Sequence, residues 1–259
     1  MEIQSKKNGK IKSIDKALSL LEFFSKNENE IGIAEISKKL NMGLSTVHRI
    51  LDTLKYRGYI LQNQKTAKYR LGMKLFELGC EVQGTKNLIK TIRPYLRKLS
   101  KLTNETANLA ILEDKEVVYL DTIESSETLR TEIIQGSRTP AHCTALGKTL
   151  LAFLDDYDFR QLYSSDVDII SITPQSISTY EELKKELKKV QKQRYALDRE
   201  ESMLGINCIG VPIFNKDKEA IAAISVTGPA SRFTVNKMEN TKEQLFSISK
   251  DISNSFFES

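Results

Sequence analysis

Residues 145–149 read Ala-Leu-Gly-Lys-Thr, the closing half of a phosphate-binding loop of the form Gly-x-x-x-x-Gly-Lys-[Ser/Thr]. The first glycine of that motif falls on His142. Without this glycine the loop cannot turn its N–H groups around a phosphate. The stretch also lies inside a helical pattern instead of following a strand. We therefore reject a nucleotide-binding loop at this position.

Two other stretches place reactive side chains next to one another. His142 and Cys143 are adjacent, which could suggest a thiol nucleophile with an imidazole base. Neighbouring side chains diverge on both helices and strands, so this pair is poorly placed to share a proton. Asp198, Glu200 and Glu201 could perform acid–base catalysis or simply mark a turn before a strand. Because no nucleophile or cofactor fingerprint accompanies these carboxylates, we expect no catalytic residue and no enzymatic activity.

The cysteines and histidines do not have the spacing of a metal site. Cys80, Cys143 and Cys208 stand 63 and 65 residues apart, and the histidines are His48 and His142. An odd number of cysteines without paired spacing argues against both a disulfide framework and a cysteine-rich zinc site. We therefore expect neither a metal nor a cofactor.

The composition is that of an ordinary globular protein. The chain has 259 residues, of which 40% are hydrophobic and 28% charged, so wholesale disorder is not expected. No apolar run reaches the roughly 18 residues of a membrane span, and the N-terminal residues lack an apolar signal core. We therefore expect a cytoplasmic protein with no membrane partner.

The positive charge is concentrated in the first third of the chain. Residues 1–79 hold 15 Lys and Arg against 8 Asp and Glu, whereas residues 80–259 hold 24 against 26. Such asymmetry indicates a nucleic-acid-binding module joined to a second domain. Part of the excess lies in residues 1–12, which we expect to form a basic flexible tail; on charge alone, a solubilising role for this tail is an alternative.

The hydrophobic pattern after this tail predicts a helix-turn-helix. Apolar residues at helical spacing follow Ser13, a suitable N-cap, and a second short helix follows from Ile33. Residues 41–43 form a turn in which we expect Gly43 to take the left-handed conformation. A third helix follows from Leu44, with apolar residues on one side and small polar residues plus an arginine on the other. This arrangement is typical of a recognition helix that enters the major groove.

A predicted β-hairpin follows the third helix. Residues 59–61 and 68–71 have strand character, and the polar turn between them carries Lys65. A hairpin with basic residues at its tip is a wing that can contact phosphates or the minor groove. A hairpin that serves only for packing is the alternative, but the local charge favours DNA. We therefore assign residues 13–72 to a winged helix-turn-helix domain that binds double-stranded DNA.

Candidate DNA contacts lie on the third helix and the wing. Arg49 could bind guanine with two hydrogen bonds, whereas Ser45 and Thr46 could hold either phosphates or bases. His48 could contact a base or remain solvated. Basic residues towards the end of the helix and in the wing could contact the DNA backbone. The candidate set is Ser45, Thr46, His48, Arg49, Lys55, Lys65 and Lys68.

The rest of the chain mixes strands and helices. We expect a linker helix over residues 73–86 and a second domain over residues 87–259. Apolar runs predict strands that form an antiparallel sheet with helices packed against it. The predicted strands are residues 107–112, 116–123, 129–134, 206–214 and 220–227. The predicted helices are residues 88–103, 144–154, 181–194 and 235–256.

With these elements in place, the chain resembles the IclR-type bacterial transcriptional regulators. The N-terminal part of the match includes LSTVHRIL at 44–51 and further motifs at 17–24, 36–37, 58–60, 69–72 and 75–79. The second part includes GINCIGVP at 205–212 and further motifs at 145–148, 198–201, 225–229 and 232–234. The resemblance implies an α+β protein in which a winged helix-turn-helix is joined by a linker helix to a GAF-like α/β effector domain. The linker helix in this family helps to form a dimer.

The resemblance also implies an effector cavity. Ser225 and Thr227 share one face of a strand, and their hydroxyls, with N–H groups at the start of the 144–154 helix, could bind a carboxylate. Serine is usual at position 227, and the extra methyl of threonine narrows the pocket. Without the resemblance, Cys208 would be assigned as a small buried apolar residue. The residues that the resemblance places in the cavity are Ala145, Leu146, Gly147, Asp198, Cys208, Ser225 and Thr227. Thr131 and Thr139 are further candidates for its wall.

These inferences predict a ligand-responsive transcriptional regulator. We expect a homodimer or dimer of dimers on a palindromic operator, acting as a repressor of a catabolic operon and responding to a small organic acid such as a keto or sugar acid. Within the family, the resemblance is to repressors of sugar-acid catabolism that respond to 2-keto-3-deoxygluconate. A transcriptional activator would use the same DNA-binding module as a repressor, so activation is an alternative to repression. The alternative is a metabolite-binding enzyme or sensor whose N-terminal module binds a partner instead of DNA.

Overall fold

The computed structural model describes the chain except residues 1–9, 26, 28, 83–84, 166–168 and 258–259, and the side chains of 256 and 257. Most of the expected basic tail, residues 1–9, therefore lies outside the described residues. The chain divides into two compact units, residues 1–83 and 84–259. Within the described residues, no helix combines the length and apolar character needed to cross a membrane.

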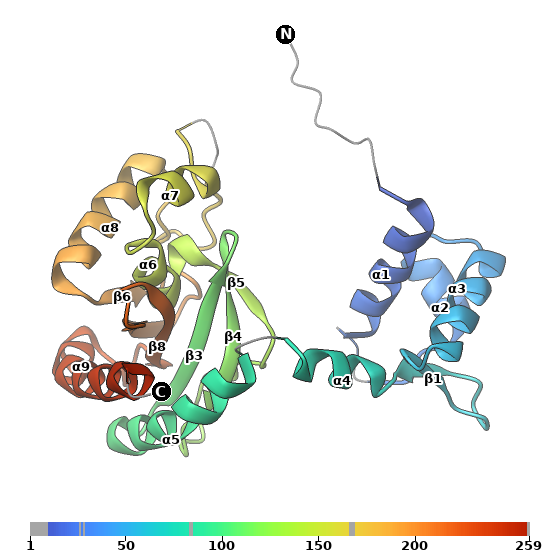
Figure 1. The fold of residues 1–259 in the computed structure, drawn as a ribbon, viewed down its shortest axis with the longest axis horizontal. Helices are drawn as coiled ribbons and strands as arrows, with labels where there is room; N and C mark the ends of the chain where they lie inside the picture. Colours follow the sequence, from blue (N-terminus) through green and yellow to red (C-terminus); the bar gives the residue numbers. More distant parts are fainter. Residues whose placement is uncertain (1–9, 26, 28, 83–84, 166–168, 258–259) are drawn as a thin grey trace, which may run out of the picture. The chain divides into compact units, whose positions relative to one another are not determined.

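The first unit consists of three helices, a two-stranded hairpin and a fourth helix (Figure 1). Its core is formed by apolar residues from the three helices and the hairpin, including Leu20, Ile36, Leu51 and Ile60. The strands β1 and β2 pair in antiparallel register, with Ile60 opposite Leu71. The elements are α1 (Lys12–Ser25), α2 (Ile33–Lys39), α3 (Leu44–Tyr56), β1 (Ile60–Gln62), β2 (Tyr69–Leu71) and α4 (Lys74–Cys80).

The turn between α2 and α3 differs from the prediction in its left-handed residue. Asn41 has a φ of 49°, whereas Gly43 has a φ of −59° and is the N-cap of α3. The prediction for Gly43 was therefore wrong. Asparagine tolerates the left-handed region because its short polar side chain fits there, so a glycine is not needed. The hydroxyl of Ser37 donates to the carbonyl oxygen of Met42 at 2.6 Å and closes the turn.

The second unit is built on a six-stranded antiparallel sheet in the order β5-β4-β3-β8-β7-β6. The strands are β3 (Thr106–Glu113), β4 (Glu116–Ile123), β5 (Arg138–Pro140), β6 (Ala196–Arg199), β7 (Ile206–Phe214) and β8 (Ala220–Pro229). The helices are α5 (Thr85–Thr103), the 3-10 helix η1 (Ala141–Cys143), α6 (Ala145–Leu151), α7 (Asp156–Leu162), α8 (Tyr180–Gln193) and α9 (Val235–Phe257).

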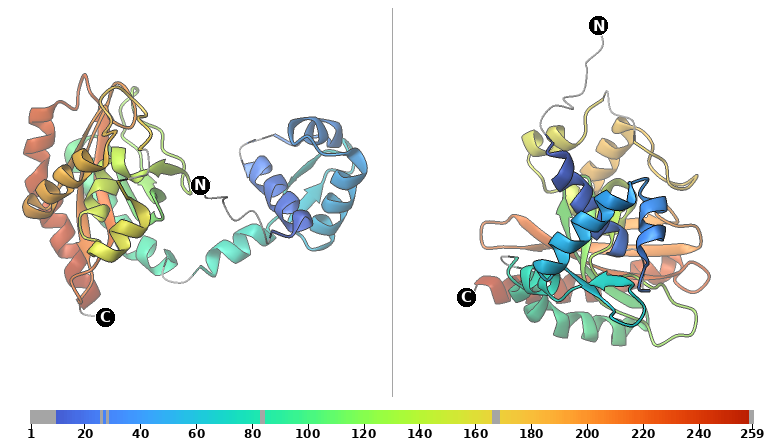
Figure 2. Two further views of the ribbon diagram at one scale, coloured as in Figure 1. Left: turned by 90° about the horizontal axis from the view of Figure 1, so that it is seen from above. Right: turned by 90° about the vertical axis from the view of Figure 1, so that its right-hand side faces the viewer.

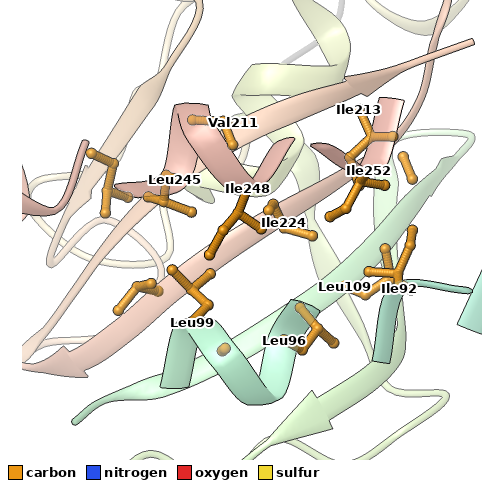
Figure 3. Close-up of a cluster of buried hydrophobic side chains, with 14 of the residues drawn as sticks. Ile92, Leu96, Leu99, Leu109, Val211, Ile213, Ile224, Leu245, Ile248 and Ile252 are labelled. Carbon is orange, nitrogen blue, oxygen red and sulfur yellow. The ribbon is translucent and has the colours of Figure 1, made fainter. Parts of the chain in front are cut away.

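Helices cover both faces of this sheet (Figure 2). Side chains of α5 and α9 pack on one face together with Leu109, Val211 and Ile224, as Figure 3 shows. Side chains of α6 and α8 pack on the other face with Cys208 and Ala223. Because strand residues alternate between faces, Ser225 and Thr227 share the face of Ala223, which packs with α6. The sequence predicted that the two residues share a face.

The prediction of a strand over residues 129–134 was wrong. These residues form no regular element, and the edge strand β5 begins later, at Arg138. The apolar side chains of Leu129 and Ile134 are more than 60% exposed, so this segment lacks the buried face that a strand on the sheet would have. Strand β6 and helix α7 were not predicted from the sequence.

Candidate nucleic-acid interface and ligand cavity

Helix α3 presents one polar face to solvent. Val47, Leu51 and Leu54 are buried in the core of the first unit and set the rotation of the helix. Because residues three and four apart lie on one side of a helix, the opposite side exposes Ser45, His48 and Arg49, with Thr46 half-buried at its margin. These are the predicted groove-contact residues. Three of the four side chains point away from the core and are accessible to a duplex.

The start of α3 offers a second means of binding phosphate. Its N-cap, Gly43, provides no side-chain cap, and its carbonyl oxygen accepts only from the N–H groups of Thr46 and Val47. The first N–H groups of a helix have no partner within the helix and lie at the positive end of its dipole. This feature was not among the sequence-based predictions, although the glycine directly before the helix is a local signal for it.

Lys55 lies in a different setting from the other predicted contacts. Its ammonium donates to Oε1 of Gln62 at 3.1 Å and lies 3.4 Å from the carboxylate of Asp52. It therefore joins α3 to the first strand of the hairpin. Its side chain is 39% exposed, so the charge contributes to the local positive potential while the lysine also has a positioning role.

The hairpin tip is held by Glu30, a residue that the sequence analysis did not single out. The Glu30 carboxylate accepts from Nδ2 of Asn63 at 2.8 Å and from the hydroxyl of Thr66 at 3.2 Å. The side-chain oxygen of Asn63 in turn accepts from the backbone N–H of Lys65 at 2.9 Å. Lys65 and Lys68 remain exposed on this ordered turn. The hairpin is therefore a structured wing that exposes two lysines, neither of which forms an ion pair within the described part of the chain.

A cavity of about 340 Å³ lies on the α6 side of the sheet in the second unit. Six predicted residues line it: Thr131, Thr139, Leu146, Asp198, Cys208 and Thr227. The other lining residues are Tyr119, Glu132, Ile133, Ile134, Ser137, Arg138, Thr144, Ser202, Met203 and Ile206. The lining residues include members of β5 and β6, the two edge strands of the sheet, and of the irregular segment before β5. Only the folded domain brings these distant segments together.

Three predicted residues, Ala145, Gly147 and Ser225, do not line this cavity. Gly147 packs so closely on the backbone of η1 that an added Cβ would lie 2.2 Å from the carbonyl oxygen of Ala141. Its N–H donates to the hydroxyl of Thr144 at 3.0 Å and is therefore not free for a ligand. Ala145 is fully buried in the core on this face of the sheet. Ala145 and Gly147 thus allow α6 to approach its neighbours.

Ser225 is fully buried and shares a hydrogen-bonding partner, Asn108, with the cavity residue Thr227. Nδ2 of Asn108 donates to the hydroxyls of Ser225 at 3.2 Å and Thr227 at 3.0 Å. The hydroxyl of Thr122 donates to Oδ1 of Asn108 at 3.3 Å. The hydroxyl of Thr227 then donates to Sγ of Cys208 at 3.0 Å. Asn108, which the sequence analysis missed, therefore orients the two cavity residues Thr227 and Cys208.

The carboxylate of Asp198 bonds mainly to its own loop. Its Oδ1 accepts from the backbone N–H of Glu201 at 2.8 Å, and its Oδ2 accepts from the hydroxyl of Ser202 at 2.6 Å. Burial raises the pKa of this carboxyl, and the hydrogen bond from Ser202 and the charge of Lys148 partly oppose the increase. Asp198 thus holds Ser202 in place on the cavity wall.

Hydroxyl groups dominate the polar part of the cavity wall. They belong to Tyr119, Thr131, Ser137, Thr139, Thr144, Ser202 and Thr227. Oγ1 of Thr131 is buried and has no hydrogen-bond partner among the described residues. Arg138, the cationic residue of the wall, pairs with Glu113 and lies 3.5 Å from Glu116. A ligand with several hydroxyl groups would match this wall because hydroxyls both donate and accept.

The residues that could have served catalysis have other partners. Nε2 of His142 lies 3.0 Å from the carbonyl oxygen of Ile170, whereas Sγ of Cys143 donates to that of Pro140 at 3.3 Å. Burial raises the pKa of the Cys143 thiol to about 12, and the charge of Asp198 adds to this increase. A thiol with such a pKa is not a nucleophile at neutral pH. Among the described residues, no group of three or more metal-ligating side chains comes together.

Two family models match the chain. The IclR helix-turn-helix domain matches residues 13–64. The bacterial transcriptional regulator IclR C-terminal domain matches residues 80–254. The chain belongs to the IclR family of bacterial transcriptional regulators. This confirms the predicted family and its role in transcription regulation.

Individual members of the IclR family match over nearly their full length. The regulator XynR of Escherichia coli is 37% identical over 91% of this chain and 93% of its own. The regulator KdgR of Escherichia coli is 35% identical over 94% of this chain and 92% of its own. The crystal structure of Thermotoga maritima IclR superposes with a TM-score of 0.78 at 31% identity, covering 95% and 99% of the two chains. The predicted α+β architecture with an N-terminal helix-turn-helix domain is therefore confirmed.

Proposed function

We propose that this IclR-family regulator is a repressor of a catabolic operon and that its effector is a small polyhydroxylated acid bound in the 340 Å³ cavity. We further propose that residues 13–72 bind the operator, residues 73–86 link the domains, and residues 87–259 bind the effector. The regulator would act in the cytoplasm as a homodimer or dimer of dimers on a palindromic site. Named relatives that regulate transcription support this role over an enzymatic one.

The unpartnered hydroxyl of Thr131 is the main observation that supports an effector with hydroxyl groups. Oγ1 of this residue is buried against the cavity with no hydrogen-bond partner among the described residues. An unsatisfied buried polar group costs about 1–3 kcal/mol, which a ligand hydroxyl at this position would recover. Thr139 and Thr227 provide further hydroxyls, and Leu146 provides an apolar wall. This mixture favours a sugar acid or a related keto acid over an apolar ligand.

Arg138 is the group that we assign to the acid function of the effector. Its guanidinium has five N–H donors in a planar fork, so it can bind a ligand carboxylate in exchange for its contacts with Glu113 and Glu116. Binding would then compete with these two surface ion pairs, which contribute little because they are solvent-exposed. Effector binding that favours one arrangement of the domains would change operator affinity, and the operator would change effector affinity by the same factor.

A thermal-shift screen of the full-length protein tests the effector assignment. We expect sugar acids and keto acids to raise the unfolding temperature, and uncharged sugars to have a smaller effect. Thr131→Val, which keeps the side-chain shape, should abolish most of the stabilisation by the active ligand. Thr128→Val, at an exposed position that does not line the cavity, is the matched control. If only sugars or nucleotides stabilise the protein, the acid assignment is wrong.

Footprinting of the promoter region upstream of the regulator's own operon tests the DNA assignment. We expect a protected palindrome at moderate salt that is lost when the active acid is added. Transcription from this promoter should rise with the acid if the protein is a repressor. Protection without release, or a fall in transcription, would contradict repression, and the absence of any protected palindrome would contradict operator binding.

A further inference from the structure

A second cavity, of about 610 Å³, lies at the opposite end of β7 from the proposed effector site. Its wall includes Phe214 at the end of β7, whereas Cys208 of the same strand lines the effector cavity. Six residues of extended strand span about 20 Å, so the two cavities are separate.

Aromatic rings form the apolar part of this cavity. The rings of Phe153 and Phe214 meet edge to face with centroids 5.0 Å apart. Phe246 is half-buried on α9 and makes a further edge contact with Tyr195. Rings that are half-exposed in a concave site leave apolar surface in water, and a ligand of matching shape would cover it.

Positive charge borders this apolar floor. Arg194, Lys218 and Lys250 line the cavity, and none of the described lining residues carries a carboxylate. No ion pair joins these three cations to an acidic side chain within the part of the chain that the structure describes. The effector cavity differs, because its Arg138 is paired with two glutamates.

The backbone holds Arg194 at the edge of the cavity. This residue ends α8 with a φ of 61°, and its N–H donates to the carbonyl oxygen of Val190 at 2.7 Å. Glycine or asparagine usually occupies this left-handed position because a longer side chain is less favourable there. The guanidinium of Arg194 lies 5.7 Å from the ring centroid of Phe214, so the charge is directed over the aromatic floor.

Two hydroxyl groups of the cavity wall already have hydrogen-bond partners within the protein. The hydroxyl of Ser249 donates to the carbonyl oxygen of Pro212 at 2.5 Å, and the hydroxyl of Ser253 accepts from the N–H of Phe214 at 3.1 Å. The cavity therefore offers an apolar floor and a cationic rim. This is the complement of a molecule with an apolar ring and one negative group.

We propose that this cavity is a second ligand site, distinct from the effector site, which binds a small aromatic carboxylate. The ring of the ligand would lie against Phe153, Phe214 and Phe246. Its carboxylate would reach the cations of Arg194 and Lys250, and the planar guanidinium suits a carboxylate with two hydrogen bonds. The volume lies within the range of small-molecule sites.

Isothermal titration calorimetry of the full-length protein with phenylacetate tests this proposal. Phenylacetate should bind with saturable heat, whereas 2-phenylethanol, which keeps the ring and lacks the charge, should bind at least about 10-fold more weakly. Arg194→Asn is suited to the left-handed backbone position, and Lys250→Gln keeps the length of the side chain. Each substitution should weaken phenylacetate binding by about 5- to 10-fold.

Matched controls separate this site from the effector cavity and from general charge effects. Lys216 lies in the same β7–β8 turn as Lys218 but is exposed and does not line the cavity. Lys216→Gln should therefore leave the affinity for phenylacetate unchanged. Thr227→Val in the effector cavity should also leave it unchanged. Absence of saturable binding would overturn the proposal. The proposal would also be overturned if Thr227→Val lost affinity for phenylacetate and Arg194→Asn did not. A change of oligomeric state in Arg194→Asn without any change in phenylacetate binding would overturn it as well.

Discussion

Nζ of Lys148 lies 2.6 and 2.7 Å from the two carboxylate oxygens of Glu201, and both residues are buried. The pair joins α6 to the loop after β6, whose Ser202 and Met203 line the effector cavity. Asp198 holds the same loop through backbone N–H groups. One face of the cavity therefore depends on an ion pair that does not itself contact the cavity.

Lys148→Met should destabilise the protein by about 3 kcal/mol, because it leaves the Glu201 carboxylate buried without its partner. Combining it with Glu201→Gln should recover part of this loss, since the uncompensated charge is then removed. Urea unfolding of the single and double variants measures the coupling. Additive losses in the double variant would show that the two side chains do not interact in solution.

Gly147→Ala should destabilise the second unit by about 3 kcal/mol or prevent its folding, because the new methyl would overlap the backbone of Ala141. Gly79→Ala is the matched control, since Gly79 lies in α4 with no atom within 4 Å of an added Cβ. That substitution should raise helix stability by about 0.5–1 kcal/mol. Thermal unfolding measures both effects. Equal stability of the two variants would contradict the close packing of α6 on η1.

Arg49→Ala should weaken operator binding by about 1–3 kcal/mol without changing the unfolding temperature, because the side chain is exposed on α3. Lys65→Gln should instead weaken specific and nonspecific DNA alike and reduce the salt slope of binding by about 1, as expected for one phosphate contact. Binding titrations at several salt concentrations distinguish these roles. An unchanged operator affinity would remove Arg49 from the DNA-contact set.

Glu105 should make the second unit less stable in acid. Burial raises the pKa of its carboxyl, but hydrogen bonds from Arg232 at 2.7 and 2.8 Å and from Lys237 at 3.0 Å prevail and lower it below the ordinary value of 4.5. The native state therefore binds this proton more weakly than the unfolded state does. The resulting stabilisation is present above about pH 4.5 and is lost as the pH falls through the lowered pKa.

The variant Glu105→Gln removes this titration. It should be less stable than the wild-type protein at pH 7, and the difference should shrink as the pH falls below 4.5. Urea unfolding between neutral and acidic pH measures the convergence. A difference that is constant across this range would contradict the assignment to the Glu105 carboxylate.

The sequence predicted the first unit in most of its detail. The apolar spacing in α1, α2 and α3 placed the buried and exposed faces, because helical periodicity is a local property of the chain. The same reasoning gave Ser225 and Thr227 a common strand face. It failed for Gly43, where the left-handed residue is Asn41. Two residue types tolerate that conformation, and the local sequence contains both.

Residues 129–134 show a second limit of local patterning. Their apolar content is typical of a strand, but the segment remains irregular and contributes Thr131, Ile133 and Ile134 to the cavity wall. A strand needs a partner strand as well as a propensity, and pairing is decided by the rest of the sheet. The short strand β6 shows the converse, because Ala196–Arg199 is paired by β7.

The sequence by itself determined the family, the two-part organisation, the exposed face of α3 and the strand face that carries Thr227. These follow from residue types and from periods of 3.6 and 2, which act over neighbouring residues. Only the tertiary structure decided which buried polar groups are free to bind a ligand and which are already bonded within the protein. Asn108 donates to the hydroxyl of Ser225 across 117 residues of chain, and Glu201 accepts from the ammonium of Lys148. The hydroxyl of Thr131 has no hydrogen-bond partner among the described residues. The pairing of buried polar groups depends on contacts between distant segments, and no local pattern encodes it.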